Sequence, residues 1–174
     1  MVELEITRLS EVQSTDVEWL WYPYIPFGKL TIIQGDPGSG KTMLVLYLAG
    51  LLSIGSPLPT EEKNVKHEPI TVIYQTSEDG YEDTIKPRLE KFENVDFNNI
   101  VFIKEDHCSL NMLDERIEQA IIQENAKLLV LDPIQAYIGQ TVDMNRANEM
   151  RPLLKNLMTI AQKHHVAIVL VGHM

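Results

Sequence analysis

The segment Gly-Asp-Pro-Gly-Ser-Gly-Lys-Thr at residues 35–42 constrains the fold of this chain more than any other feature. It follows an apolar run at residues 30–34 and leads into an apolar segment at residues 41–54. Glycines in such a segment let the backbone turn so that successive N–H groups point inward, and the start of a following helix adds partial positive charge. The pattern therefore predicts a strand, an anion-binding loop and a helix, in that order.

All eight positions of this loop match the pattern of the P-loop, also called Walker A. The residues are Gly35, Asp36, Pro37, Gly38, Ser39, Gly40, Lys41 and Thr42. We expect the loop to bind the phosphates of a nucleoside triphosphate, with Lys41 bridging the terminal phosphates and the Thr42 hydroxyl coordinating Mg²⁺. The pattern leaves the choice between ATP and GTP open. The alternative is a strand-to-helix turn that is rich in glycine only because it is tight, but the Lys-Thr ending favours nucleotide binding.

Short apolar runs alternate with amphipathic segments along the rest of the chain, which is typical of βαβ units around a parallel sheet. The runs are apolar at consecutive positions, as expected for strands that helices cover on both faces. We expect strands at residues 30–34, 70–75, 100–103, 128–132 and 166–171, and helices at residues 41–54, 81–92, from 111–114 onward and around 153–161. The predicted fold is a three-layer α/β/α P-loop NTPase with a mainly parallel central sheet.

Length, charge and cysteine content narrow the classes of protein further. The 174 residues predict one domain rather than two. With 15 Lys and Arg residues against 25 Asp and Glu residues the formal net charge is −10, which argues against binding nucleic acid through surface charge alone. Cys108 is the single cysteine, and no apolar run approaches the ~20 residues of a membrane span. We expect a cytoplasmic protein without membrane contacts.

The predicted strand at residues 128–132, Leu-Leu-Val-Leu-Asp, ends in an acidic residue, which is the Walker B pattern. Ligands of open α/β sheets collect at the carboxyl ends of the strands. We therefore expect Asp132 to serve Mg²⁺ together with Thr42. Buried strands also end in Asp for purely structural reasons, but the position downstream of a P-loop favours the metal site.

Pro133 follows Asp132, so the chain lacks the Asp-Glu pair that places a metal ligand beside a general base. The base is expected to come from the strand at residues 70–75, which leads to Glu78 and Asp79 at the same sheet edge. Glu78 is our candidate for the group that deprotonates the attacking water. The alternative is that both carboxylates only cap the next helix. For Asp79 we favour such a capping role, or a role in positioning the base.

The last predicted strand runs into Gly172 and His173, again at the carboxyl edge. A polar side chain there can contact the γ-phosphate and sense its loss, so His173 is a candidate sensor. The alternative is an ordinary histidine at the end of a strand.

This set of motifs resembles the RecA-type P-loop ATPases, and among them the hexameric replicative helicases and the plasmid or phage replication ATPases. The resemblance is carried by the P-loop, by Glu78, by residues 128–133, by His173 and by the segment at residues 19–30 that introduces the P-loop. It implies that Glu78 activates water, that Asp132 serves Mg²⁺ and that His173 senses the γ-phosphate. It also implies an ATP-hydrolysing, RecA-like domain of a DNA replication or recombination protein, helicase-like or primase-associated, that forms a hexameric ring in the full-length protein.

RecA-type cores continue beyond the sensor with a DNA-facing loop, further strands and often an arginine finger, whereas this chain stops at Met174. We therefore expect residues 29–174 to be a core truncated at its C-terminus, with weak turnover on its own. Single-stranded DNA is expected to bind outside or near residues 134–151, where Arg146 and Arg151 lie, although exposed positions at a helix start are favoured for both arginines. Arg88 is expected either near the nucleotide or in a surface ion pair.

Residues 1–28 are expected to form an N-terminal arm that packs on the core. Its prolines predict an irregular conformation rather than a strand. Its aromatic side chains favour a cover for the sheet or a subunit boundary over stacking on adenine or on nucleic-acid bases. They are Trp19, Trp21, Tyr22, Tyr24 and Phe27.

Two other functions remain open. A P-loop kinase uses the same loop but needs an arginine-rich lid, and no arginine cluster is found in the sequence. A nucleotide-dependent assembly switch would bind ATP with little turnover.

Overall fold

A five-stranded, fully parallel sheet forms the centre of the computed structural model, which describes residues 4–139, 142–144 and 146–173. The strand order is β3-β7-β6-β4-β5. The strands are β3 (Leu30–Gly35), β4 (Val72–Thr76), β5 (Ile100–Val101), β6 (Leu128–Asp132) and β7 (Ala167–His173). All five expected strands are thus present.

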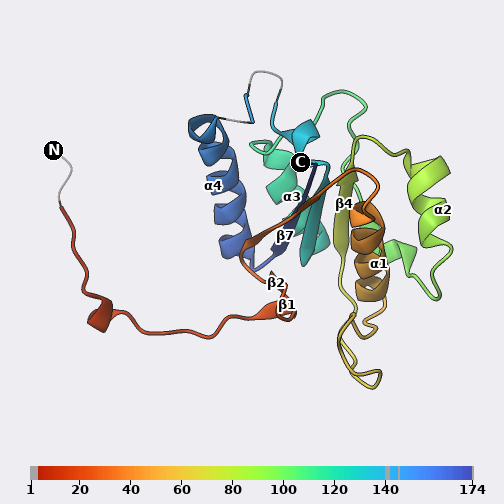
Figure 1. The fold of residues 1–174 in the computed structure, drawn as a ribbon, viewed down its shortest axis with the longest axis horizontal. Helices are drawn as coiled ribbons and strands as arrows, with labels where there is room; N and C mark the ends of the chain where they lie inside the picture. The colour runs from red at the N-terminus through yellow and green to blue at the C-terminus, as the bar shows by residue number, and fades with distance from the viewer. Residues whose placement is uncertain (1–3, 140–141, 145, 174) are drawn as a thin grey trace.

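Helices cover both faces of the sheet (Figure 1), so the predicted three-layer α/β/α architecture is confirmed. One face packs on α1 (Lys41–Ser53) and α2 (Lys86–Leu89), and the other packs on α3 (Glu115–Glu124) and α4 (Ala147–His164). Successive strand residues point to opposite faces, so each strand contributes to both cores. In β6, Leu128 and Val130 join the α1 side, whereas Leu129 and Leu131 join the α4 side.

The strand register brings the predicted site residues to one edge. Gly35 at the end of β3 lies opposite His173 on β7, and Thr76 at the end of β4 lies opposite Asp132 on β6. Along the chain, β6, which ends in Asp132, is the third strand after β3, the strand that leads into the P-loop. In the sheet, only β7 lies between β3 and β6.

The helix expected at residues 81–92 is present over residues 81–89, but its first turn is wide. Residues Tyr81–Ile85 form a π-helical turn, η2, and only Lys86–Leu89 are α-helical. Pro87 explains the difference, because it has no N–H group for the hydrogen bond that a regular helix needs at this position. The prediction of a helix is thus confirmed for residues 81–89, and residues 90–92 lie beyond its end.

Strand β5 is shorter than expected because the Gln75 side chain takes the place of a backbone partner next to residue 103. The Gln75 amide accepts a hydrogen bond from Ile103 N at 3.0 Å and donates one to Ile103 O at 3.0 Å. It thus occupies the backbone groups that would extend the ladder beyond Val101.

The segment before the P-loop forms a small hairpin, so the prediction that it contains no strand was wrong. Strands β1 (Trp19–Trp21) and β2 (Ile25–Pro26) pair in antiparallel orientation. Leu20, Trp21 and Ile25 are buried in the α1-side core. Residues 4–18, which include the 3-10 turn η1 (Leu9–Glu11), are exposed and extend away from the body (Figure 1).

Two further 3-10 turns are η3 (Phe97–Asn99), before β5, and η4 (Ile134–Tyr137), after β6. Pro152 lies within α4, which begins at Ala147. The segment at residues 55–68 contributes the buried Leu58 to the core. Within the described residues, no helix is both long and apolar enough to cross a bilayer.

Candidate functional site

The glycine-rich loop connects β3 to α1, as its sequence predicts. Gly38 and Gly40 have positive φ angles of 77° and 89°, which favour glycine because other residues are strained there. A Cβ atom at either position would meet no atom within 4 Å, so the loop borders open space at both glycines. Gly40 is the residue before α1, whose first backbone N–H groups have no partner inside the helix. This arrangement suits an anion such as a phosphate group.

The Lys41 side chain folds back onto its own loop. Its ammonium group donates hydrogen bonds to the carbonyl oxygens of Gly35 at 2.8 Å and Asp36 at 2.7 Å, and a longer one of 3.3 Å to the Ser39 hydroxyl. The side chain is buried, so these contacts keep a positive charge within the loop.

Asp132 lies in contact with Thr42, the other residue predicted to hold Mg²⁺. The Thr42 hydroxyl donates a hydrogen bond of 2.8 Å to Asp132 Oδ2, although 90 positions separate the two residues. The carboxylate is buried at the end of β6. Both side chains offer oxygen atoms, the ligand type that Mg²⁺ prefers, and Mg²⁺ sites commonly use one or two protein groups together with substrate phosphates. The residues present therefore fit the expected ion.

Tyr74 is part of this cluster, and sequence reasoning missed it. Its phenol donates a hydrogen bond of 2.9 Å to the same Asp132 Oδ2 atom. Burial and the Asp132 charge raise the pKa of Tyr74 far above its ordinary range, so the phenol stays neutral and remains a donor. The sequence pattern indicates only that Tyr74 belongs to a buried strand. The contact with Asp132 depends on how β4 and β6 pair, which the pattern does not give.

Glu78 and Asp79 have different surroundings. Arg88 donates a hydrogen bond of 2.8 Å to Asp79 Oδ2, which assigns both groups to a surface ion pair. The Glu78 side chain is 61% exposed, and its Oε2 atom lies 3.7 Å from His173 Nε2. The structure thus brings Glu78 and His173 together at the sheet edge, while Asp79 is held by its neighbour.

His173 ends β7 beside the P-loop strand. Its carbonyl oxygen accepts a hydrogen bond of 3.2 Å from the Gln135 amide, which lies just after Asp132 and Pro133. Its Nδ1 atom is buried without a hydrogen-bond partner among the described residues. Gln135 is a second residue that the sequence did not single out, and it ties the end of β7 to the turn after β6.

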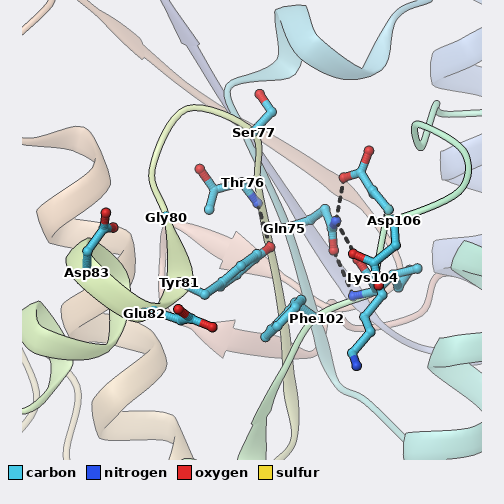
Figure 2. A pocket seen from close by; sticks show the side chains of 12 residues that line it. Gln75, Thr76, Ser77, Gly80, Tyr81, Glu82, Asp83, Phe102, Lys104 and Asp106 are labelled. Atoms are coloured by element: carbon cyan, nitrogen blue, oxygen red, sulfur yellow. Dashed lines mark hydrogen bonds between the residues drawn. The ribbon is translucent and has the colours of Figure 1, made fainter.

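A cavity of about 720 Å³ opens at the ends of β4 and β5 (Figure 2), and none of residues 35–42 of the P-loop lines it. The rings of Tyr81 and Phe102 stack there, with centroids 3.6 Å apart. The Tyr81 hydroxyl accepts a hydrogen bond from Thr76 N, and burial raises the pKa of Tyr81 to about 12. The lining carries more carboxylates than cations, which disfavours phosphate binding in this cavity. Its charged residues are Glu82, Asp83, Lys104, Glu105 and Asp106.

The arginines proposed to contact DNA lie near the start of α4. Arg146 forms ion pairs with Asp143 and Glu149, and Arg151 is exposed. Residues 140, 141 and 145 of the segment at 134–151 lie outside the described part of the chain.

Comparisons with known proteins identify a family and several similar sequences. A family model described as an AAA domain matches residues 3–174. The DNA repair protein RadA of Streptococcus pneumoniae is 28% identical over 149 residues, which cover 84% of this chain and 30% of that protein. The DNA repair protein RadA of Halalkalibacterium halodurans is 28% identical, and that of Listeria monocytogenes is 26% identical, each over 84% of this chain and 28% of the relative. The chain thus spans less than a third of the length of these relatives.

Proposed function

The chain belongs to the AAA domain family and is a RecA-type P-loop ATPase, and from this premise we propose that it binds Mg²⁺-ATP and hydrolyses it to drive a protein acting on DNA. The observation that carries the proposal is the 2.8 Å hydrogen bond between Thr42 and Asp132. It joins the predicted Walker A and Walker B motifs at one point of the sheet edge.

Each side chain has a role in this proposal. Lys41 exchanges its contacts with the loop carbonyls for the terminal phosphates, and the loop N–H groups bind the remaining phosphate oxygens. Thr42 and Asp132 would hold Mg²⁺, which neutralises phosphate charge when it is bound. Glu78 orients and deprotonates the attacking water. His173, 3.7 Å from Glu78, contacts the γ-phosphate and senses its loss.

The connection to DNA rests on the relatives, which are named as DNA repair proteins. We propose a domain of a replication or recombination protein, helicase-like or primase-associated, that contacts single-stranded DNA near residues 134–151. The net charge of −10 favours such a local contact over broad electrostatic attraction.

We also propose that the domain acts as a homo-oligomer, a hexameric ring in the full-length protein. The extended residues 4–18 support a contact between copies, because they expose apolar side chains to solvent. Leu4, Ile6 and Leu9 are each about 80% exposed or more. Exposed apolar groups in an extended segment favour burial against a partner surface.

Two alternatives remain as test outcomes. A P-loop kinase needs arginines that close over the phosphates, but Arg88, Arg116 and Arg146 are each paired with acidic side chains. A nucleotide-dependent assembly switch needs the same binding site but little hydrolysis.

One measurement separates the three functions. Phosphate release from Mg²⁺-ATP is followed with and without single-stranded DNA, and in parallel with a panel of small phosphoryl acceptors. Release that rises with DNA supports the proposal. Phosphate transfer to an acceptor identifies a kinase, and ATP binding without release or transfer identifies the switch.

A further inference from the structure

Tyr74 reaches Asp132 because of the register between β4 and β6. Tyr74 lies opposite Val130, which is two residues before Asp132. The side chains of Tyr74 and Val130 both point to the α1 side of the sheet. Tyr74 and Asp132 are therefore diagonal neighbours on adjacent strands, and the 2.9 Å bond from the Tyr74 hydroxyl to Asp132 Oδ2 shows that the aromatic side chain bridges this diagonal. A tyrosine at this position can therefore place its hydroxyl at the end of the neighbouring strand while its ring stays in the core.

The contacts define how the carboxylate is held. The Tyr74 phenol at 2.9 Å and the Thr42 hydroxyl at 2.8 Å both donate to Oδ2 of Asp132. No described residue donates a hydrogen bond to the other oxygen, Oδ1, which therefore keeps its lone pairs for a ligand. Tyr74 is 1% exposed and Asp132 is 4% exposed, so water competes little for this bond.

We propose that Tyr74 is a positioning residue of the metal site. Its hydroxyl fixes the Asp132 carboxylate with Oδ2 toward Thr42, and it thereby sets the affinity for a divalent cation bound with a nucleotide. This inference rests on the proposed function and adds a residue to it. It follows from a general property of metal sites, in which hydrogen bonds to the ligands orient them and tune metal affinity.

The phenol is a suitable donor for this role. Thr42 is expected to turn a lone pair toward the ion, whereas Tyr74, which is buried in the α1-side core, keeps its bond to Asp132 Oδ2. A phenylalanine would preserve the ring packing of Tyr74 against the α1-side core, so the Tyr74→Phe variant removes little more than one oxygen atom.

The test measures binding of Mn²⁺, a spectroscopic substitute for Mg²⁺, to the 174-residue chain in the presence of ADP. Free Mn²⁺ is followed by electron paramagnetic resonance, and ADP binding in EDTA is measured separately. We expect Tyr74→Phe to weaken Mn²⁺ binding about tenfold and to leave metal-free ADP binding unchanged. Tyr137→Phe is the matched control, because Tyr137 is equally buried and donates no hydrogen bond to Asp132 or Thr42. It should bind Mn²⁺ like the wild type.

A double-mutant comparison separates positioning from a structural effect. If Tyr74 acts through the carboxylate, Tyr74→Phe has no further effect on Mn²⁺ affinity in the Asp132→Asn background. Urea unfolding of all four proteins verifies that each is folded when the Mn²⁺ affinities are compared. Equal Mn²⁺ affinity of Tyr74→Phe and the wild type, or an undiminished loss in the Asp132→Asn background, overturns the proposal. If the wild type binds no Mn²⁺ with ADP, the proposed function is overturned as well. If the wild type binds Mn²⁺ and Tyr74→Phe binds it equally well, only this inference is overturned.

Discussion

Arg88 donates a 2.8 Å hydrogen bond to Asp79, the residue directly after Glu78. The pair neutralises one of two adjacent carboxylates at the end of β4. Glu78 keeps an exposed carboxylate beside His173. The contact therefore occupies Asp79 and leaves Glu78, the candidate favoured by the sequence, with an exposed carboxylate at this edge.

Replacing Glu78 by Gln should stop hydrolysis without affecting nucleotide binding. The amide keeps the shape of the side chain but cannot accept a proton, so ATP turnover is expected to fall about 10²- to 10⁴-fold. Turnover is measured as phosphate release, and binding is measured by calorimetry with Mg²⁺-ADP. Asp79→Asn is the control and should keep most of the activity. Loss of turnover in Asp79→Asn with full activity in Glu78→Gln would move the base to Asp79.

Removing the P-loop lysine should abolish stabilisation by nucleotide. A ligand at 100 times its Kd stabilises a folded protein by about 2.7 kcal/mol, which corresponds to roughly 5–10 °C for a domain of this size. We expect Mg²⁺-ATP to raise the melting temperature of the wild type by this amount and that of Lys41→Ala hardly at all, because the charge inside the loop is lost. The exposed Lys155→Ala variant should respond like the wild type. An equal rise in Lys41→Ala would refute the phosphate-binding role of the loop.

The hairpin before the P-loop should contribute to stability rather than to base stacking. The Trp21 ring is buried, and its indole N–H donates a hydrogen bond of 2.7 Å to the Pro59 carbonyl. Trp21→Ala is expected to lower the free energy of unfolding by about 3–5 kcal/mol, as for other large aromatic residues in cores. Trp19, 36% exposed, is the comparison, and Trp19→Ala should cost less than about 1 kcal/mol. The free energy of unfolding of each variant is to be measured by urea unfolding. A Trp19→Ala variant that folds normally but loses ATP affinity would instead support stacking on adenine.

Asp114 should stabilise the start of α3 in a pH-dependent manner. Its carboxylate caps the helix by accepting a hydrogen bond from Arg116 N at 2.9 Å, and its ion pair with the Arg116 side chain lowers the pKa of Asp114 below the ordinary 3.8. A lowered pKa in the folded state means that the stabilisation is complete above the ordinary value and is lost as the pH falls through the folded value. Asp114→Ala should therefore cost about 1 kcal/mol at pH 7 and clearly less near pH 2.5. An equal cost at both pH values, measured by urea unfolding, would contradict the charge contribution.

Much of the site was predictable because its motifs are local. The P-loop, the apolar run that ends in Asp132 and the helix start at Asp114 each depend on residues close in sequence. Their backbone geometry follows from glycine conformations, strand composition and capping. The N-terminal hairpin was missed because long-range packing overrode the local pattern. The π-helical turn before Pro87 was not predicted either, although the absent N–H group of the proline is a local feature.

The chain order of its motifs thus determined the α/β class of the protein and the chemistry expected at its sheet edge. Tertiary structure alone decided that β7 lies between the P-loop strand and β6, that Arg88 pairs with Asp79, and that the Tyr74 hydroxyl donates a hydrogen bond to Asp132. The physical reason is that hydrogen bonds across a sheet depend on strand order and register, and these are set by how the whole core packs rather than by any short segment.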